Sequence, residues 1–448
     1  MDKVIVGKCS DYTHDGKGVI KVNKIPIFVA NVLIGETAKV LITKKEQGYY
    51  LGKRLELITV SSARCKPVCP YFRNCGGCDL QHMVYEEQLK FKTNRVQEAL
   101  KRIGGVEVEV QPCLGMEKPY FYRNKVQVPF GYDKEGKLVA GFFKKTTHEI
   151  VDIDKCRIED YDGDKIILCL KDLFNKYHVK PYDIEQDKGT VRTVLVRKSS
   201  LNRDLMVVIT TRSENLNHGQ EIVQELMEKY PRVKTVIQNI NKIHTSILMG
   251  TDNVVLAGPG YIEDAILGVK FKVSPLSFYQ VNPKQTEVLY KKAIEFAELQ
   301  PSDVVLDAYC GVGTIGLCLA NKVKQVTGVE IVKSAIEDAK ENAKVNDINN
   351  AEFYCEDAKD FIQTAASKSL NYDVVVVDPP RNGCDSTFIE SLLIMKPKKI
   401  VYVSCEPSSL ARDIKLLKNA YDVIKCQPVD MFPQTYHVET VVALVLKK

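Results

Sequence analysis

The sequence predicts an α/β fold in three parts, and three observations support this prediction. After residue 300, short apolar runs alternate with helical segments, which is the pattern of a doubly wound sheet. Residues 1–60 read as five β-rich runs separated by tight turns, as in a small barrel of the oligonucleotide-binding kind. A chain of 448 residues is also long for one core, so we place domains at 1–62, 63–270 and 271–448.

The composition is that of a globular protein, with 45% hydrophobic and 27% charged residues. No apolar run approaches the roughly 20 residues of a membrane helix, and the start lacks the layout of a signal peptide. We therefore expect a cytoplasmic protein without a membrane partner, whose cysteines stay reduced. Of the net charge of +6, residues 1–60 contribute +4, from ten Lys or Arg against six Asp or Glu. This basic segment indicates a nucleic-acid partner, with a solvated basic face as the alternative.

The first two parts carry few specific signals. In the barrel, the candidate stacking and phosphate contacts are Tyr12, His14, Lys17, Tyr49, Tyr50 and Lys53. Residues 85–103 have apolar side chains at near-helical spacing and end at two glycines, so they predict a helix. Whether this helix packs on the second or the third part stays open. From about 110 to 270, β-runs surround one amphipathic helix at 219–230, which indicates a mixed α+β domain.

The third part reads as seven strands, of which five belong to βα units and two form a closing hairpin. The strands are expected at 304–309, 326–331, 352–355, 373–378, 399–404, 422–429 and 438–446. This is a Rossmann-like platform for a nucleotide-type cofactor, and such a fold names no reaction by itself.

A glycine-rich loop follows the first of these strands. Asp307 ends the strand, Gly311, Gly313 and Gly316 follow, and Glu330 ends the next strand, where an acid binds ribose hydroxyls. The spacing fits a dinucleotide site. An acid on the first strand is, however, the arrangement of S-adenosylmethionine-dependent methyltransferases, which have no pyrophosphate for it to repel. Together with the motifs below, this favours a methyltransferase over a dehydrogenase.

Two further motifs narrow the target atom. Asp378-Pro379-Pro380 ends the fourth strand, but Arg381 follows where methyltransferases acting on amino groups usually have an aromatic residue. Carbon 5 of uracil is a poor nucleophile, so its methylation needs a thiolate at carbon 6 and a base for the carbon 5 proton. Cys405 after the fifth strand and Glu439 before the last strand supply both groups, with His437 as a competing base. Taken alone, a strand-end cysteine is more often a packing residue.

Nearly the whole chain resembles the RNA uracil-5-methyltransferases, through "SFYQVNPKQTEVLY", "LDAYCGVGTIGL", "DPPR", "SC-x-P" and a final H-x-E. The resemblance implies that Cys405 is the nucleophile and Glu439 the proton acceptor. It implies contacts with S-adenosylmethionine from Gln280, Tyr309, Glu330 and Asp378, with Asp357 reaching the adenine. It also places the segment Arg123-Asn124-Lys125 near the RNA.

One residue departs from the family pattern. The family commonly has Asn after the cysteine, and here Glu406 stands in that position. A carboxylate facing the thiol would raise the pKa of Cys405 and reduce the thiolate fraction. In an extended strand end, we expect Glu406 to point to the other face.

A second group of cysteines lies at Cys69, Cys75 and Cys78. Their C-x₅-C-x₂-C spacing differs from the C-x₃-C-x₂-C of radical S-adenosylmethionine enzymes, and a zinc site completed by Cys65 is chemically possible. The run "CPYFRNCGGCDLQH" resembles the iron–sulfur motif of ribosomal-RNA members of the same family, in which Cys156 would be the fourth ligand. We favour a [4Fe–4S] cluster of structural role, with zinc as the alternative.

These resemblances predict a monomeric enzyme that methylates carbon 5 of a uridine in 23S ribosomal RNA. The transfer RNA branch of the family generally lacks both the cluster and the N-terminal barrel, which here resembles a TRAM domain. Two alternatives stay open: the same chemistry on transfer RNA, and a non-catalytic iron–sulfur RNA-binding sensor.

Overall fold

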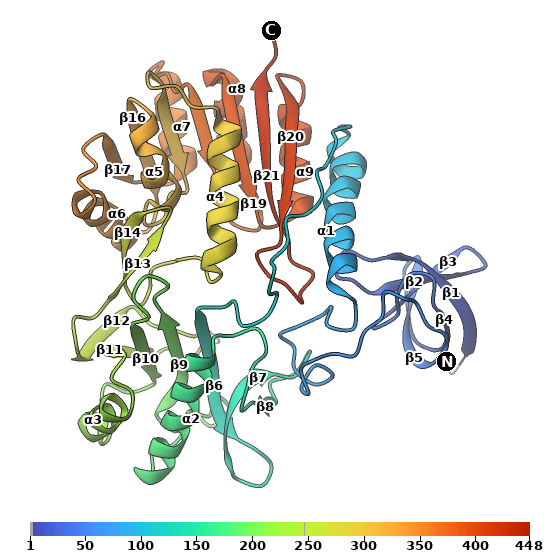
Figure 1. Ribbon diagram of the computed structural model, residues 1–448, viewed down its shortest axis with the longest axis vertical. Helices are drawn as coiled ribbons and strands as arrows, with labels where there is room; N and C mark the ends of the chain where they lie inside the picture. The colour runs from blue at the N-terminus through green and yellow to red at the C-terminus, as the bar shows by residue number, and fades with distance from the viewer. Residues whose placement is uncertain (1–2, 246) are drawn as a thin grey trace.

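The computed structural model describes residues 3–245 and 247–448, and it contains a closed barrel and two seven-stranded sheets (Figure 1). The barrel lies to one side and the mixed central sheet at one end (Figure 1). The mostly parallel C-terminal sheet, which belongs to the part we call the catalytic part, lies at the other end. Across the described residues, no helix combines the length and apolar character needed to cross a membrane.

The N-terminal part forms the five-stranded barrel that the sequence predicts. Its strands are β1 (Val4–Tyr12), β2 (Gly18–Val22), β3 (Ile25–Val29), β4 (Thr37–Glu46) and β5 (Tyr49–Thr59). They close in the order β1-β2-β3-β5-β4, with β4 paired back to β1. Alternate apolar side chains such as Ile20, Ile27 and Val40 fill the interior, which is why a strand set this short closes on itself.

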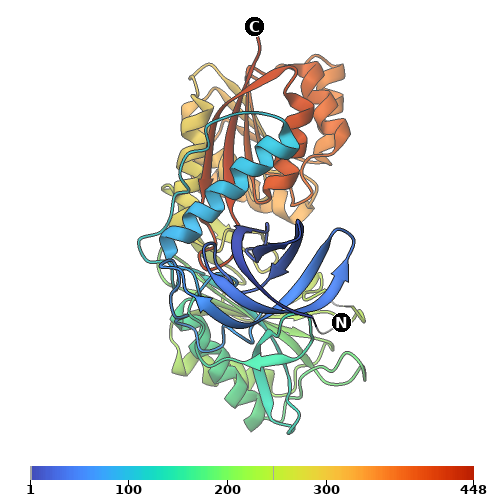
Figure 2. The same cartoon turned by 90° about the vertical axis from the view of Figure 1, so that its right-hand side faces the viewer.

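Helix α1 (Tyr85–Ala99) follows the loop-like segment after the barrel and packs on the catalytic part. It widens into one π-helical turn, Leu100–Gly104, and ends at Gly105, whose φ of 62° is left-handed. Val96 and Leu100 belong to the core formed with α9 and the catalytic sheet. Figure 2 shows α1 lying along the catalytic part, with the barrel next to its lower end.

The central part is built on a mixed sheet in the order β12-β11-β10-β9-β6-β7-β8. Its strands are β6 (Lys125–Tyr132), β7 (Leu138–Phe143), β8 (Ile150–Asp152), β9 (Val191–Lys198), β10 (Leu205–Thr211), β11 (Val233–Ile240) and β12 (Asp252–Ala257). Helices α2 (Tyr161–Lys176) and α3 (Gly219–Lys229) cover one face of it.

The expectation of a single helix in this part was wrong, because α2 is a second one. Asp160 caps α2 by accepting a hydrogen bond from the Asp162 N–H (2.9 Å). Ile166, Leu170 and Phe174 recur at helical spacing and are buried against the sheet. Residues 166–170 are all apolar, so the sequence shows a continuous apolar run there and no helical period.

The catalytic part contains the doubly wound sheet that the sequence predicts, in the order β17-β16-β15-β18-β19-β21-β20. Its parallel strands are β15 (Val304–Ala308), β16 (Gln325–Glu330), β17 (Ala351–Cys355), β18 (Val374–Val377) and β19 (Lys399–Ser404). β21 (Glu439–Leu446) runs antiparallel between β19 and β20 (Tyr421–Val429). The strand order reverses between β15 and β18, where such folds bind ligands.

Helices cover both faces of this sheet. One face carries α4 (Pro283–Ala297), α5 (Thr314–Leu319) with a 3₁₀ turn (Ala320–Lys322), and α6 (Lys333–Val345). The other face carries α1, α7 (Ala358–Ser367), α8 (Ser386–Met395) and α9 (Pro407–Leu417). A hairpin of β13 (Ile262–Ile266) and β14 (Val269–Val273) shares the first core, so the central and catalytic parts are joined by continuous apolar packing.

Candidate active site

The predicted site residues of the catalytic part gather at the C-terminal edge of its parallel strands. Ala308 is in register with Val329 of β16 and Val377 of β18. The residues that follow these three, Tyr309, Glu330 and Asp378 in the same row, therefore come side by side at the edge. The remaining predicted residues extend this row: Asp357 after β17, Cys405 after β19, and Glu439 at the start of β21.

Cys405 and Glu439 lie opposite each other at the ends of the neighbouring strands β19 and β21. The antiparallel register of β19 and β21 runs from Lys399 opposite Val445 to Ser404 opposite Thr440. One more step along both chains places Cys405 opposite Glu439, and directly opposed residues project to the same face of a sheet. Glu439 is 5% exposed and Cys405 is half-buried, so the thiol is the more accessible of the two groups.

The charges around this pair oppose ionisation in the free protein. Burial raises the pKa of the Cys405 thiol to about 12, the Glu439 and Asp378 carboxyls add to the effect, and Arg381 counteracts it. Burial also raises the pKa of Glu439 to about 8, with Asp378 adding to the rise and Arg381 again opposing it. Arg381 is thus the cation that favours both the thiolate and the carboxylate.

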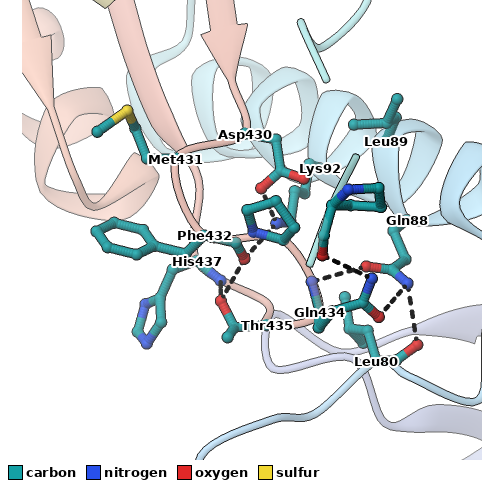
Figure 3. Close-up of polar contacts among 12 residues, drawn as sticks. Leu80, Gln88, Leu89, Lys92, Asp430, Met431, Phe432, Gln434, Thr435 and His437 are labelled. Atoms are coloured by element: carbon teal, nitrogen blue, oxygen red, sulfur yellow. Dashed lines mark hydrogen bonds and ion pairs between the residues drawn. The ribbon is translucent and has the colours of Figure 1, made fainter. Parts of the chain in front are cut away.

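His437, the competing base, lies in a different setting. Burial lowers the pKa of its imidazole to about 4, and Arg381, Arg95 and Lys92 lower it further. Its ring contacts those of Tyr436 and Phe432, and in Figure 3 it is turned away from the ion pair of Lys92 and Asp430. The Glu439 carboxyl, by contrast, is the charged group that most raises the pKa of the Cys405 thiol.

Asp307 holds the glycine-rich loop in place through a hydrogen bond. This residue is 1% exposed, and its Oδ2 accepts a hydrogen bond from the Gly316 N–H (2.7 Å). A Cβ at Gly316 would lie 2.8 Å from the same carboxylate, so the close approach requires glycine. Gly311 adopts a left-handed φ of 56° and donates its N–H to Glu330 (3.3 Å), which ties the loop to the next strand.

The other predicted cofactor residues lie around this loop. Tyr309 has a φ of 65°, a strained value for a non-glycine residue, at the turn that leaves β15. Asp357 caps α7 by accepting from the Lys359 N–H (3.0 Å). Gln280 is 7% exposed, in the segment before α4, and its neighbour Phe278 is 71% exposed. An aromatic ring this exposed beside the row of site residues is a surface on which a base can stack.

The second group of cysteines lines a single cavity of about 160 Å³. Cys69, Cys75, Cys78 and Cys156 all contribute to its wall, although Cys156 is far from the others in the sequence, while Cys65 does not. Among residues 3–245 and 247–448, no three His, Cys, Asp or Glu side chains converge closely enough to hold a metal ion as they stand. Four thiols in one cavity wall are nevertheless donors of the type that iron–sulfur clusters use.

Sequence reasoning missed Arg95, which lies on α1 beside the active site. Its guanidinium donates to both carboxylate oxygens of Glu406 (2.8 and 3.0 Å), 311 residues further along the chain. No local pattern in the sequence indicates such a pairing. It holds the Glu406 carboxylate against α1.

Comparison with known proteins gives consistent results. The sequence pattern of the tRNA (uracil-5-)-methyltransferase family matches residues 84–447. An uncharacterized RNA methyltransferase of Clostridium tetani is 46% identical over 96% of this chain and 93% of its own. A second, from Listeria innocua, is 46% identical over 98% of this chain and 96% of its own.

Among solved structures, the fold is similar to that of the tRNA (uracil-54, C5)-methyltransferase of Pyrococcus abyssi in complex with S-adenosyl-L-homocysteine. The two are 28% identical, with a TM-score of 0.78, over 98% of this chain and 100% of the other. The similarity thus extends over the barrel as well as the catalytic sheet. The family pattern spans most of the chain and the relatives span nearly all of it. The chain therefore belongs to the tRNA (uracil-5-)-methyltransferase family and is an RNA (uracil-5-)-methyltransferase.

Proposed function

We propose that this enzyme methylates carbon 5 of a uridine through a covalent adduct between Cys405 and carbon 6 of the base. The observation that carries the proposal is the register that sets Cys405 opposite Glu439. A nucleophile and a base on the same face of one sheet edge can act on adjacent ring atoms, which this reaction requires. The target base reaches this edge by leaving its stack.

The steps follow from the roles of the two side chains. The Cys405 thiolate forms a C–S bond at carbon 6, and the displaced π electrons make carbon 5 nucleophilic. After carbon 5 has taken up the methyl group, the Glu439 carboxylate removes its proton. The electron pair left at carbon 5 re-forms the 5,6 double bond, and the C–S bond breaks to return the thiolate.

S-adenosylmethionine supplies the electrophilic methyl group when it is bound. We infer that its site is formed by the row of edge residues and the glycine-rich loop, with Gln280, Tyr309, Gly311, Glu330, Asp357 and Asp378 as the contacts. The buried Asp307 holds the loop in place, since its Oδ2 is engaged by Gly316, while its buried Oδ1 has no partner among the described residues. The solved relative with bound S-adenosyl-L-homocysteine supports a ligand of this class.

For the substrate, we propose large-subunit ribosomal RNA, on the resemblance of the cysteine motif to that of ribosomal-RNA enzymes. Transfer RNA is the second candidate, and one observation favours it. The Pyrococcus abyssi enzyme acts on transfer RNA and is similar over 98% of this chain, barrel included. The barrel therefore does not separate the two substrates, contrary to the expectation from sequence, and the argument for ribosomal RNA depends on the cysteines.

The cavity supports the assignment of a cluster to the central part. We keep the domain boundaries expected from the sequence: a barrel at 1–62, a central part at 63–270 and a catalytic domain at 271–448. Cys156 lines it and Cys65 does not, which fits three clustered ligands with a remote fourth better than a local zinc site. We propose that Cys69, Cys75, Cys78 and Cys156 hold a [4Fe–4S] cluster whose role is to fix the loops that carry them.

One experiment tests the function and separates the substrates. Full-length protein is incubated with methyl-labelled S-adenosylmethionine and either ribosomal or transfer RNA, and the label is mapped. We expect 5-methyluridine in ribosomal RNA, while label in transfer RNA alone would establish the second candidate. No label at any uridine would overturn the enzymatic proposal and leave an RNA-binding sensor.

The covalent step has its own test. A Glu439→Gln protein should accumulate an RNA–protein adduct that survives denaturation, because the carbon 5 proton is no longer removed. Failure of the adduct to accumulate, with product still formed, would exclude Glu439 as the base.

A further inference from the structure

Glu406, the residue that departs from the family pattern, pairs with a side chain that no local sequence pattern indicates. The carboxylate of Glu406 meets the Arg95 guanidinium in a two-pronged ion pair at 2.8 and 3.0 Å. The Arg95 side chain is 6% exposed and that of Glu406 is 26% exposed, so water screens the pair little. Both bonds come from the same nitrogen, Nη2, so both carboxylate oxygens are engaged and the carboxylate stays turned toward the guanidinium.

Arg95 also contacts a second segment. Another of its N–H groups donates to the Tyr436 carbonyl (2.9 Å), and its guanidinium lies 5.5 Å from the centre of the Tyr436 ring. Tyr436 stands three residues before Glu439, and Glu406 stands directly after Cys405. One side chain on α1 therefore binds both segments that end at the catalytic pair.

The backbone around Glu406 is fixed in the same arrangement. Glu406 has extended dihedrals (φ −140°, ψ 108°), and its carboxylate caps α9 by accepting from the Ser408 N–H (3.4 Å) and hydroxyl (2.9 Å). Burial would raise the pKa of Glu406, but Arg95 and Ser408 outweigh it and lower the pKa, so the carboxylate stays charged. The largest charge effects on the pKa of the Cys405 thiol come from Glu439, Asp378 and Arg381.

We propose that Arg95 is a positioning residue of the methylation reaction: it holds the Glu406 carboxylate away from the Cys405 thiol and ties the segment leading to Glu439 to the same turn. Without Arg95, a negative charge one residue from the nucleophile is free to turn toward it. The thiolate is then disfavoured, and the opposition of Cys405 and Glu439 is loosened. The proposal rests on Cys405 being the nucleophile of the proposed function.

The test compares Arg95→Gln, Glu406→Asn and the double variant in the full chain. Asn is the residue that the family commonly has after the cysteine, and it keeps a cap for α9. The charged groups on every neighbouring element stay in place in all three variants: Lys92 on α1, Asp378 and Arg381 after β18, and His437 and Glu439 before and in β21.

The first measurement needs neither RNA nor methyl donor. Alkylation of Cys405 by iodoacetamide at pH 8.5 is followed by mass spectrometry of its peptide, with exposed Cys355 as the internal reference. Below the pKa of the thiol, the rate follows the thiolate fraction, so Arg95→Gln should slow Cys405 about three- to tenfold and leave Cys355 unchanged. Glu406→Asn in the same chain should restore the rate, because the released charge is gone.

The second measurement is the rate of adduct formation with RNA. Arg95→Gln should slow it about tenfold or more through the combined loss of thiolate and alignment, and the double variant should recover the thiolate share only. Arg95→Lys keeps a cation without the two-pronged geometry, so its alkylation rate should lie close to that of the wild type.

Three outcomes would overturn the proposal. These are an unchanged alkylation rate in Arg95→Gln, a double variant as slow as Arg95→Gln, and an equal slowing of Cys355, which would mean that the effect is not specific to Cys405. Failure of the proposed function looks different. If Cys405 is not the nucleophile, Cys405→Ala still forms product, while the alkylation rates still respond to Arg95.

Discussion

Cys405 and the four cysteines of the cavity share a functional group and differ in their surroundings. Cys405 stands alone at a strand end, opposite a buried carboxyl and near the cation Arg381. The cavity thiols come from two distant segments and converge on one enclosed space. A thiol among acid–base groups is suited to covalent chemistry, whereas several thiols around a cavity are suited to binding a cluster. The same residue type therefore takes its role from its neighbours.

The two regions also touch. The loop from β20 to β21 carries Glu439, and its Gln434 carbonyl accepts hydrogen bonds from the Asp79 and Leu80 N–H groups (both 2.9 Å), directly after Cys78. On the other side of the loop, Gln88 and Lys92 of α1 contact it, as Figure 3 shows. A change at the cysteine cavity can thus reach Glu439 through Asp79, Leu80 and the segment from Gln434 to Glu439.

The largest effect that separates the two regions is expected at Cys405. Cys405→Ala removes the nucleophile, so methyl transfer should fall by about 10⁴-fold or more, with no adduct formed. Iron content should be unchanged, because the variant leaves the cavity intact. Label transfer from S-adenosylmethionine and iron analysis measure both, and Cys169→Ala, in α2, serves as the matched control. An adduct formed by Cys405→Ala would place the nucleophile elsewhere.

The next effect concerns the support of the loop that carries Glu439. Lys92 and Asp430 form an ion pair of 2.5 Å with both side chains fully buried, and Tyr85 also donates to Asp430 (2.8 Å). Lys92→Met leaves a buried carboxylate without its cation, which should lower the free energy of unfolding by about 3–5 kcal/mol. Thermal or denaturant unfolding measures the loss.

A neighbouring lysine on the same helix provides the control for this prediction. Lys90 is 73% exposed, and its contact with Glu87 is 3.8 Å long, so Lys90→Met should change stability little. Equal losses for the two variants would show that α1 responds to any lost lysine and that the buried pair has no special weight.

A smaller effect on activity is expected from the other side of the comparison. Cys156→Ser removes the remote ligand, so the protein purified without oxygen should lose most of its iron. Methyl transfer should fall about ten- to hundredfold, less than for Cys405→Ala, because the loop held by Asp79 and Leu80 shifts while the catalytic pair remains. The matched variant is Cys65→Ser, outside the cavity wall, which should retain its iron. Loss of iron from Cys65→Ser alone would make Cys65 the fourth ligand, in the local arrangement considered for a zinc site.

The sequence was sufficient for the catalytic part because its information is local. Each βα unit carries its own strand run and helix, and parallel register then brings Tyr309, Glu330 and Asp378 to one edge. The four connections between the barrel strands are likewise marked by short-range signals. α2 escaped detection because its residues 166–170 are all apolar, so they show no helical period and resemble a buried strand.

Contacts between distant segments could not be predicted in this way. The pairing of Arg95 with Glu406 joins residues 311 apart, and that of Lys92 with Asp430 joins residues 338 apart. Both depend on where α1 docks, which no spacing within residues 85–103 specifies. The expectation that Glu406 points away from the thiol came from strand geometry. The cation that pairs with Glu406 lies on another helix, so it could be identified only from the three-dimensional structure.

The smallest expected effect is a pH dependence that identifies the base. Glu439 must be a carboxylate to accept the proton, and burial raises its pKa to about 8, so it is mostly protonated at pH 7. Breakdown of the adduct to product should therefore speed up about tenfold between pH 7 and 9 and level off above that. Single-turnover quench experiments with labelled RNA measure this step apart from adduct formation, which follows the thiol. His437, with a pKa lowered to about 4, would already be deprotonated at pH 6 and would give a flat profile from there to pH 9. A flat profile would thus transfer the role of base from Glu439 to His437, and a rise centred near 8 would assign it to Glu439.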